Sequence, residues 1–212
     1  MIHERIVISS GHGKYVRGAH GIIDEVDEAR RVVNAVAETM RQRGIEATEF
    51  HDDVSETQNE NLNRIVNFHN SKSRDLDVSV HFNAFEQTSS PRGVEVLYLT
   101  QAALAGQVSA AIAECGFINR GAKKRTDLFF LNQTDMPSIL IEVCFVDSEA
   151  DTDVYDEQFN AICDAITSAI TGLTDEAEPP PVEPPVTLPR VDIEVSGDCV
   201  IFVNGQQIGT PT

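Results

Sequence analysis

Three short segments of this sequence place reactive side chains where a strand is expected to end. His12 lies between two glycines after the apolar run 6–8, and His81 follows a second apolar run. Glu142 interrupts a third apolar run, 139–143. A carboxylate in such a run loses its solvation unless a cation, a metal or a proton partner compensates. Two histidines and one such carboxylate therefore predict a functional site.

A zinc site is the chemistry that these residue types favour. A catalytic zinc ion takes three protein ligands and keeps one position open, and two histidines with one glutamate are a standard set. The missing acid is sought in the segment 21–28, at the predicted start of a helix. The same acids would also complement the positive helix end, and spacing leaves open which of them binds metal. The candidates are Asp24, Glu25, Asp27 and Glu28.

Short apolar runs and helical spacing alternate along residues 1–173. Strands are predicted at 5–9, 46–50, 78–81, 93–99, 128–131 and 138–143, and helices at 26–43, 56–71, 101–114 and 154–171. Strands separated by helices indicate an α/β fold with a mostly parallel or mixed sheet, covered by helices on both faces. In such sheets ligands bind beyond the carboxyl ends of strands, where both histidines are predicted.

The composition changes after Gly172. Residues 174–189 are rich in proline and acidic residues, which predicts an extended linker after a catalytic domain at 1–173. Residues 190–212 contain strand-like runs and turn signals that predict a small β-hairpin for targeting or assembly. A lone hairpin is marginally stable, so we expect it to pair with another element. One such pairing is a homo-oligomer formed through its exposed edges.

Charge and composition exclude several classes of protein. The 212 residues carry a net charge of −18, which disfavours binding to nucleic acid or to anionic membranes. No apolar stretch is long enough to span a bilayer, and the N-terminus does not have the pattern of a signal peptide. Four scattered cysteines without a CxxC pair predict free thiols in a chain made in the cytosol, and not zinc ligands.

Six ordered motifs resemble one family, the zinc N-acetylmuramoyl-L-alanine amidases of bacterial autolysins and phage endolysins. They extend across nearly all of residues 1–172, and the resemblance implies a twisted, mostly parallel six-stranded sheet flanked by helices. One departure is Ser9-Ser10, where many members carry Asp-Pro or a similar pair before Gly-His-Gly. The motifs are SGHG at 10–13, GIIDE at 21–25, SVHFNA at 79–84, GVEVLY at 93–98, NRGAK at 119–123 and LIE at 140–142.

The resemblance also implies roles for individual residues. His12, Glu25 and His81 would be the zinc ligands, and Glu142 the catalytic carboxylate. The substrate would be bacterial peptidoglycan, cut at the amide between the lactyl group of N-acetylmuramic acid and L-alanine by zinc-activated water. Asn83 would orient either the substrate or the neighbouring histidine.

Two further positions have more than one interpretation. The basic segment 123–125 either meets carboxylates of the stem peptide or forms an ordinary solvated turn. His20 lies close to the expected site in sequence, and a solvated loop position is the expectation for it.

The sequence leaves three competing functions open. Cys144 stands two residues beyond Glu142, so in a regular strand both face the same side, and a cysteine hydrolase with His81 as base is the first. A cysteine in an apolar run is, however, usually an inert core residue. The second is a wall-binding module without turnover, and the third is a different zinc peptidase or carboxypeptidase.

The biological setting is predicted from the missing signal. A phage endolysin, made in the host cytoplasm and released to the wall at lysis, fits a chain without a secretory segment. A bacterial autolysin exported by another route is the competing interpretation.

Overall fold

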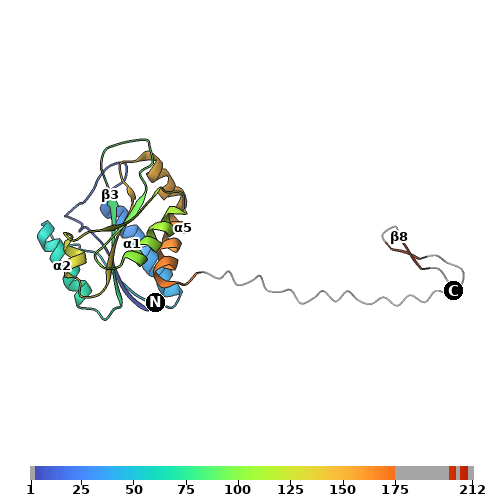
Figure 1. Cartoon of the computed structure of the whole chain (residues 1–212), viewed down its shortest axis with the longest axis horizontal. Coiled ribbons are helices and arrows are strands. Elements are labelled where there is room, and N and C mark those ends of the chain that lie inside the picture. The colour runs from blue at the N-terminus through green and yellow to red at the C-terminus, as the bar shows by residue number, and fades with distance from the viewer. Residues whose placement is uncertain (1–2, 175–200, 204–205, 210–212) are drawn as a thin grey trace. The chain divides into compact units, whose positions relative to one another are not determined.

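The computed structural model divides the chain into two compact units, Met1–Asp175 and Glu176–Thr212. It describes residues 3–174, 201–203 and 206–209 (Figure 1). In the second unit, β7 (Ile201–Val203) pairs antiparallel with β8 (Gln206–Gly209). The predicted linker lies outside the described residues from position 175 onward, as does the first strand-like run of the predicted hairpin.

The first unit is built on a six-stranded sheet in the order β2-β1-β3-β6-β4-β5. Four neighbouring pairs are parallel, and only β4 and β6 are antiparallel. The predicted mostly parallel six-stranded α/β fold is therefore confirmed. The strands are β1 (Arg5–Ser10), β2 (Glu46–Phe50), β3 (Leu76–Asn83), β4 (Val94–Tyr98), β5 (Asn119–Lys124) and β6 (Ser138–Phe145).

Helices cover both faces of this sheet (Figure 1). The larger core joins one face to three helices, which supply residues such as Val33, Val108 and Ile166. Two other helices form a smaller apolar cluster on the opposite face. The helices are α1 (Glu25–Gln42), α2 (Gln58–Asn70), α3 (Ala102–Ala113), α4 (Phe129–Gln133) and α5 (Glu149–Thr171).

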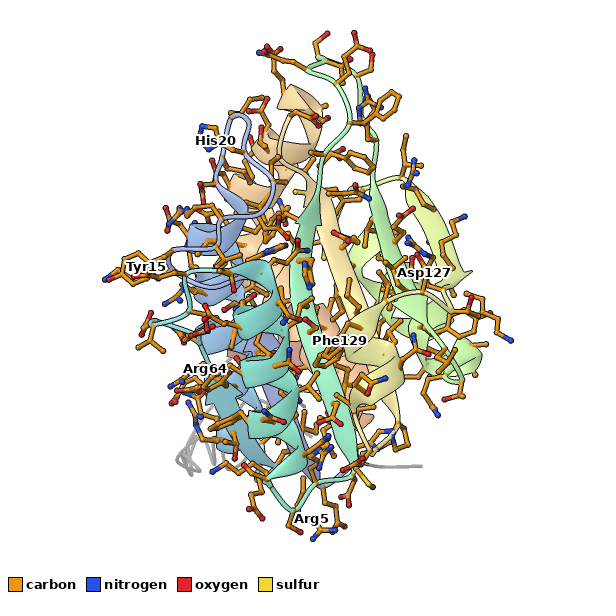
Figure 2. The ribbon with its side chains drawn as sticks, turned by 90° about the vertical axis from the view of Figure 1, so that its left-hand side faces the viewer. Arg5, Tyr15, His20, Arg64, Asp127 and Phe129 are labelled. Atoms are coloured by element: carbon orange, nitrogen blue, oxygen red, sulfur yellow. The ribbon has the colours of Figure 1, made fainter. Side chains whose placement is uncertain are left out.

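The smaller cluster covers only part of its sheet face. It packs α2 and α4 on Leu140 of β6 and Leu97 of β4. The next side chains on this face, toward the carboxyl ends of β3 and β6, are polar: His81 pairs in register with Glu142, and Glu142 with Glu95. All three are only half-buried, and Figure 2 views this face, with Phe129 of α4 labelled. The uncovered row of polar residues is where a site can form.

The strand predicted at 128–131 is wrong, because this segment leads into and forms α4. A short apolar run does not distinguish a strand from a buried helical turn, and here Phe130 and Leu131 pack against α2. The sixth strand is instead β5, with the sequence NRGAKK. As an edge strand with exposed and half-buried side chains, it lacks the apolar alternation that would reveal it.

The remaining boundaries agree closely with the prediction, except that α5 starts earlier than expected. Ser148 caps it by accepting a hydrogen bond from the N–H of Asp151 at 3.2 Å. None of the helices in the described residues is long and apolar enough to cross a membrane.

Candidate metal centre and active site

A close backbone crossing places His12 beside His81. The N–H of Gly11 donates to the carbonyl of Val80 at 2.9 Å, so the chain leaving β1 passes over the end of β3. A Cβ on Gly11 would lie 1.8 Å from Nε2 of His81, so only glycine permits this approach. The rings of His12 and His81 meet edge to face, with 5.0 Å between their centroids.

The four acids at the start of α1 have different roles, and only one faces the histidines. Asp24 is the N-cap and accepts hydrogen bonds from two backbone N–H groups of the first turn. Asp27 is exposed, and Glu28 accepts a hydrogen bond from the Tyr155 hydroxyl at 2.7 Å. Glu25 is 3% exposed and points inward. Of the four acids that spacing left open, Glu25 is the one that lies beside both histidines.

His12, Glu25 and His81 form one compact cluster. Oε1 of Glu25 lies 3.0 Å from Nδ1 of His81 and 3.6 Å from Nε2 of His12. The carboxylate is fixed by backbone donors as well: Oε1 accepts from the N–H of Phe82 at 3.1 Å, and Oε2 accepts from the N–H of Ala19. These bonds hold the carboxylate in one orientation between the two rings.

Burial and mutual charge set the protonation of the cluster. Burial lowers the pKa of His12, and the charge of His81 lowers it further. Burial also acts to lower the pKa of His81, but the hydrogen bond and charge of Glu25 outweigh it and raise that pKa. Burial acts to raise the pKa of Glu25, yet the His81 hydrogen bond and the two histidine charges lower it overall. An ionised carboxylate between imidazoles is a suitable environment for a cation.

The donor set fits a divalent metal of the zinc type. One donor atom from each of the three residues lies within 4.8 Å of the others. Ligands held about 2.1 Å from a tetrahedral ion lie about 3.4 Å apart, so the donors need only a modest inward shift, and two imidazoles with one carboxylate suit zinc. The N–H groups of Phe82 and Ala19 orient Glu25, as groups behind the ligands do in metal sites. The cluster could therefore hold such an ion with little movement.

Glu142 lies directly beside this cluster. It pairs in register with His81 on β3 and with Glu95 on β4, so the three side chains share one face. Its Oε2 atom is buried and has no hydrogen-bond partner among the described residues. Burial, followed by the charges of Glu25 and Glu95, raises the pKa of Glu142 to about 7 against the opposing effect of His81. A carboxyl group with this pKa can accept and release a proton near neutral pH.

The side chain of Asn83 bonds to Glu95, which lies next to Glu142 on the side away from His81. Its Nδ2 donates to Oε1 of Glu95 at 3.2 Å, and its Oδ1 accepts from the N–H of Ala84 at 2.9 Å. Neither bond reaches His81, so the structure does not pair Asn83 with that ring. Its role in substrate binding stays a prediction.

Sequence reasoning assigned no role to Glu95 or Arg120, although both lie in the recognised motifs. Nε of Arg120 donates to Oε2 of Glu95 at 2.8 Å, close to Glu142. A signal was available for Glu95, because it interrupts the apolar run 94–98 as Glu142 interrupts its own.

An apolar groove of about 320 Å³ opens beside the cluster. His12 and His81 line one end, while Leu62 of α2 and Phe129 of α4 line its walls. Figure 2 shows Phe129 on this face of the sheet. The two histidines can therefore be reached through this groove.

The predicted shared face of Cys144 and Glu142 is wrong. An irregularity in the pairing of β3 with β6 sets Glu142 opposite His81 but Phe145 opposite Asn83, so β6 gains a residue here. Cys144 consequently turns into the main core, where it is 0% exposed. Burial raises the pKa of its thiol well above the ordinary value. A cysteine nucleophile beside Glu142 is therefore excluded.

A second constellation resembles a serine hydrolase triad but is structural. Nε2 of His69 lies 2.9 Å from Oγ of Ser9, and Nδ1 lies 2.7 Å from Oδ1 of Asp77. All three side chains are 0% exposed, so no substrate can reach them. Arg74 completes the network by donating to both carboxylate oxygens of Asp77. These buried bonds tie α2 to β1 and β3.

The remaining singled-out residues lie at the surface. His20 is exposed, with Nδ1 3.3 Å from Oδ2 of Asp24, as expected for a loop position. In the basic segment, Arg125 donates twice to Asp127, at 2.8 and 2.7 Å. Lys123 and Lys124 are exposed.

An α/β sheet carrying a His-Glu-His cluster with a carboxylate beside it is an arrangement suited to metal-assisted hydrolysis. Residues 6–172 match the family described as N-acetylmuramoyl-L-alanine amidase. The chain belongs to this family. All six sequence motifs, from residue 10 to residue 142, lie within the matched range.

Known proteins resemble the chain in sequence and in fold. A Clostridium perfringens protein described as an uncharacterized 38.4 kDa protein is 30% identical over 160 residues, covering 73% of this chain and 46% of its own. The chain spans about half the length of the curated relatives it matches.

Among solved structures, the catalytic domain of the CD27L endolysin, targeting Clostridium difficile, is 25% identical with a TM-score of 0.75. That match covers 81% of this chain and 99% of the other. The amidase AmiC2 of Nostoc punctiforme is 26% identical with a TM-score of 0.66, covering 78% and 93%.

Proposed function

We propose that this protein hydrolyses the amide between the lactyl group of N-acetylmuramic acid and L-alanine in bacterial peptidoglycan. The observation that carries the proposal is the placement of Glu142 in register with His81, beside the cluster of His12, Glu25 and His81. Family membership supplies the class of substrate. The groove beside the cluster supports an extended polymer as substrate.

In this proposal His12, Glu25 and His81 hold a zinc ion. When bound, zinc supplies a Lewis acid that polarises the scissile carbonyl and acidifies water. The backbone N–H groups of Phe82 and Ala19 hold the Glu25 carboxylate in the orientation this role needs. Gly11 and Gly18 allow the backbone to pass close to the ligand side chains.

Glu142 acts as general base and then as general acid. As carboxylate it accepts a proton from the attacking water while the oxygen bonds to the amide carbon. It then delivers this proton to the L-alanine nitrogen as the C–N bond breaks, which leaves the lactyl carboxyl group and a free amine. Burial raises the pKa of the Glu142 carboxyl, which is the direction that suits a group that must both accept and release a proton.

Digestion of purified peptidoglycan tests the proposal. Newly freed L-alanine amino groups are measured against newly freed sugar reducing ends, with chelator, without it, and after zinc is restored. The proposal requires amino groups that disappear with chelator and return with zinc. Reducing ends without amines would indicate a glycosidase, and no release from several wall types would favour a wall-binding module. Release of C-terminal amino acids instead would favour a zinc carboxypeptidase.

We further propose that residues 1–173 are the catalytic domain of an endolysin and that residues 190–212 serve targeting or assembly after a linker at 174–189. The likeness to the CD27L catalytic domain supports the endolysin role. Lysis of susceptible cells by protein added from outside, compared between residues 1–173 and the full chain, tests both statements. Equal lysis by the two forms would remove the targeting role.

A further inference from the structure

A row of polar side chains crosses the sheet from the candidate metal cluster to its β5 edge. The strand order places His81 on β3, Glu142 on β6, Glu95 on β4 and Arg120 on β5. Glu95 is the link: Oε1 accepts from the amide of Asn83, and Oε2 accepts from Nε of Arg120. Arg120 is thus a cation held on the side of Glu142 that faces away from the cluster.

A local irregularity directs the Arg120 side chain. Val94 pairs with Asn119 and Glu95 pairs with Gly121, so Arg120 is the extra residue on β5. Gly121 has a φ of 78°, a conformation that favours glycine. Such bulges redirect side chains next to active sites. Here the bulge brings the guanidinium onto the side chain of Glu95.

The guanidinium keeps donors for another partner. Arg120 uses Nε for Glu95 and stacks on the ring of Phe145, with 5.0 Å from Cζ to the ring centroid. Its side chain is 39% exposed, and its two terminal nitrogens bond to none of the described residues. Arg125 keeps only one terminal nitrogen for this purpose, because its Nε and Nη2 both donate to Asp127. A guanidinium with free, exposed N–H groups is well suited to a carboxylate.

Proton transfer fixes which part of the substrate comes near this cation. The group that protonates the leaving nitrogen must lie beside that nitrogen, so the departing peptide is on the side of Glu142. The acyl side, with the glycan, stays nearer the cluster. In Figure 2 Asp127 lies on one side of β3, while Tyr15 and His20 lie on the other. Beyond Glu142 on β6 the sheet continues with β4 and β5, so a peptide that departs away from the cluster extends over these two strands.

We propose that Arg120 forms a carboxylate subsite for the departing peptide, taking an acidic residue next to the L-alanine. This inference rests on the proposed function, because it uses the position of the scissile bond. In a chain with net charge −18 an acidic peptide is repelled by most of the surface, and a local cation offsets that repulsion. Glu95 is then the residue that positions Arg120.

Two matched substrates test the subsite on the full-length, zinc-loaded protein. Both are soluble glycan–peptide fragments that are identical up to L-alanine. In one, the residue that follows L-alanine carries a free α-carboxyl group, and in the other that group is a carboxamide. Wild type is expected to prefer the carboxylate by about fivefold in kcat/KM, mainly through KM. Arg120→Gln should abolish this preference, and Arg120→Lys should keep part of it. Arg17→Gln, an arginine of similar exposure in the loop between His12 and Glu25, should keep the full preference.

The ratio between the two substrates separates recognition from structural support. If Arg120 only supported Glu95 and Glu142, its loss would slow both substrates equally and the preference would persist, which would overturn the inference. Equal kcat/KM for both substrates in wild type would overturn it as well, while leaving the amidase function intact. No cleavage of either fragment or of whole peptidoglycan would remove the proposed function, and the inference with it.

Discussion

Glu142 and His81 lie opposite each other in the parallel register of β6 and β3, at the point where α2 and α4 cease to cover the sheet. Their neighbours one step back are apolar or small, Leu140 and Ser79. On one face of the sheet, the pair Ser79 and Leu140 thus lies beneath the helices, and the pair His81 and Glu142 forms a reactive row beyond them. The reactive row lies where the sheet face stays accessible from outside.

Replacing Glu142 by glutamine should keep the fold and the metal but remove the proton acceptor. We expect the rate of amide hydrolysis to fall about 100- to 10,000-fold, the range for loss of a general base. Zinc content by elemental analysis should stay at the wild-type level. A variant with near-normal turnover would show that Glu142 does not carry the proton.

The same substitution should change how the stability of metal-free protein depends on pH. The folded-state pKa of Glu142 is about 7 against an ordinary 4.5, so the fold favours its protonated form. As pH rises through this window, ionisation of Glu142 destabilises wild type, by about 3 kcal/mol once pH exceeds 7. Glu142→Gln lacks this loss, so it should gain stability relative to wild type between pH 4.5 and 7. Urea unfolding in chelator measures the difference, and a difference independent of pH would contradict the raised pKa.

His81→Ala should lose bound metal, because it removes one of three ligands. His51→Ala is the matched control: its ring bonds to Asn34 at 2.8 Å and to Ser10 at 3.0 Å, outside the cluster. Elemental analysis after dialysis should find zinc in the control and none in His81→Ala. Full zinc occupancy in His81→Ala would remove this residue from the ligand set.

Gly18→Ala should disturb the ligands without changing their identity. A Cβ at this position would lie 2.1 Å from Oε2 of Glu25 and 2.5 Å from Cδ2 of His12. We expect zinc affinity to fall about 10- to 100-fold, as when support of a ligand is lost. Gly106→Ala in α3 meets nothing within 4 Å and should be neutral or stabilise by up to about 1 kcal/mol. Competition with a chelator measures the zinc affinity. Equal affinities of Gly18→Ala and wild type would show that the loop around residue 18 shifts to accommodate the methyl group without displacing the ligands.

His69→Ala should destabilise the fold and spare the chemistry. It leaves Ser9 and Asp77 buried without their shared partner, which we expect to cost about 3 kcal/mol in the free energy of unfolding. His20→Ala, at an exposed position, should stay within about 0.5 kcal/mol of wild type. Folded His69→Ala should bind zinc normally. A loss of metal with unchanged stability would place His69 in the functional site instead.

Much of this protein could be deduced from local pattern. Alternating strand and helix signals predicted the α/β class, because burying one face of each element leaves a periodic trace in the sequence. Glu142 stood out because a carboxylate within an apolar run is costly without a partner. The motifs in family order identified His12, Glu25 and His81 as the candidate ligands, and their donor atoms do come within 4.8 Å of one another.

Tertiary structure decided what depends on relations between distant segments. The choice of Glu25 over its acidic neighbours became a matter of geometry once α1 set its direction against His81. The edge strand β5 lacks the apolar alternation from which a strand can be predicted. The apolar run at 128–131 forms a helical turn because its side chains pack against α2. The extra residue in β6 that turns Cys144 into the core and the bulge that aims Arg120 arise from pairing between strands. Pairing register is a property of two strands together, so the sequence of either one does not contain it.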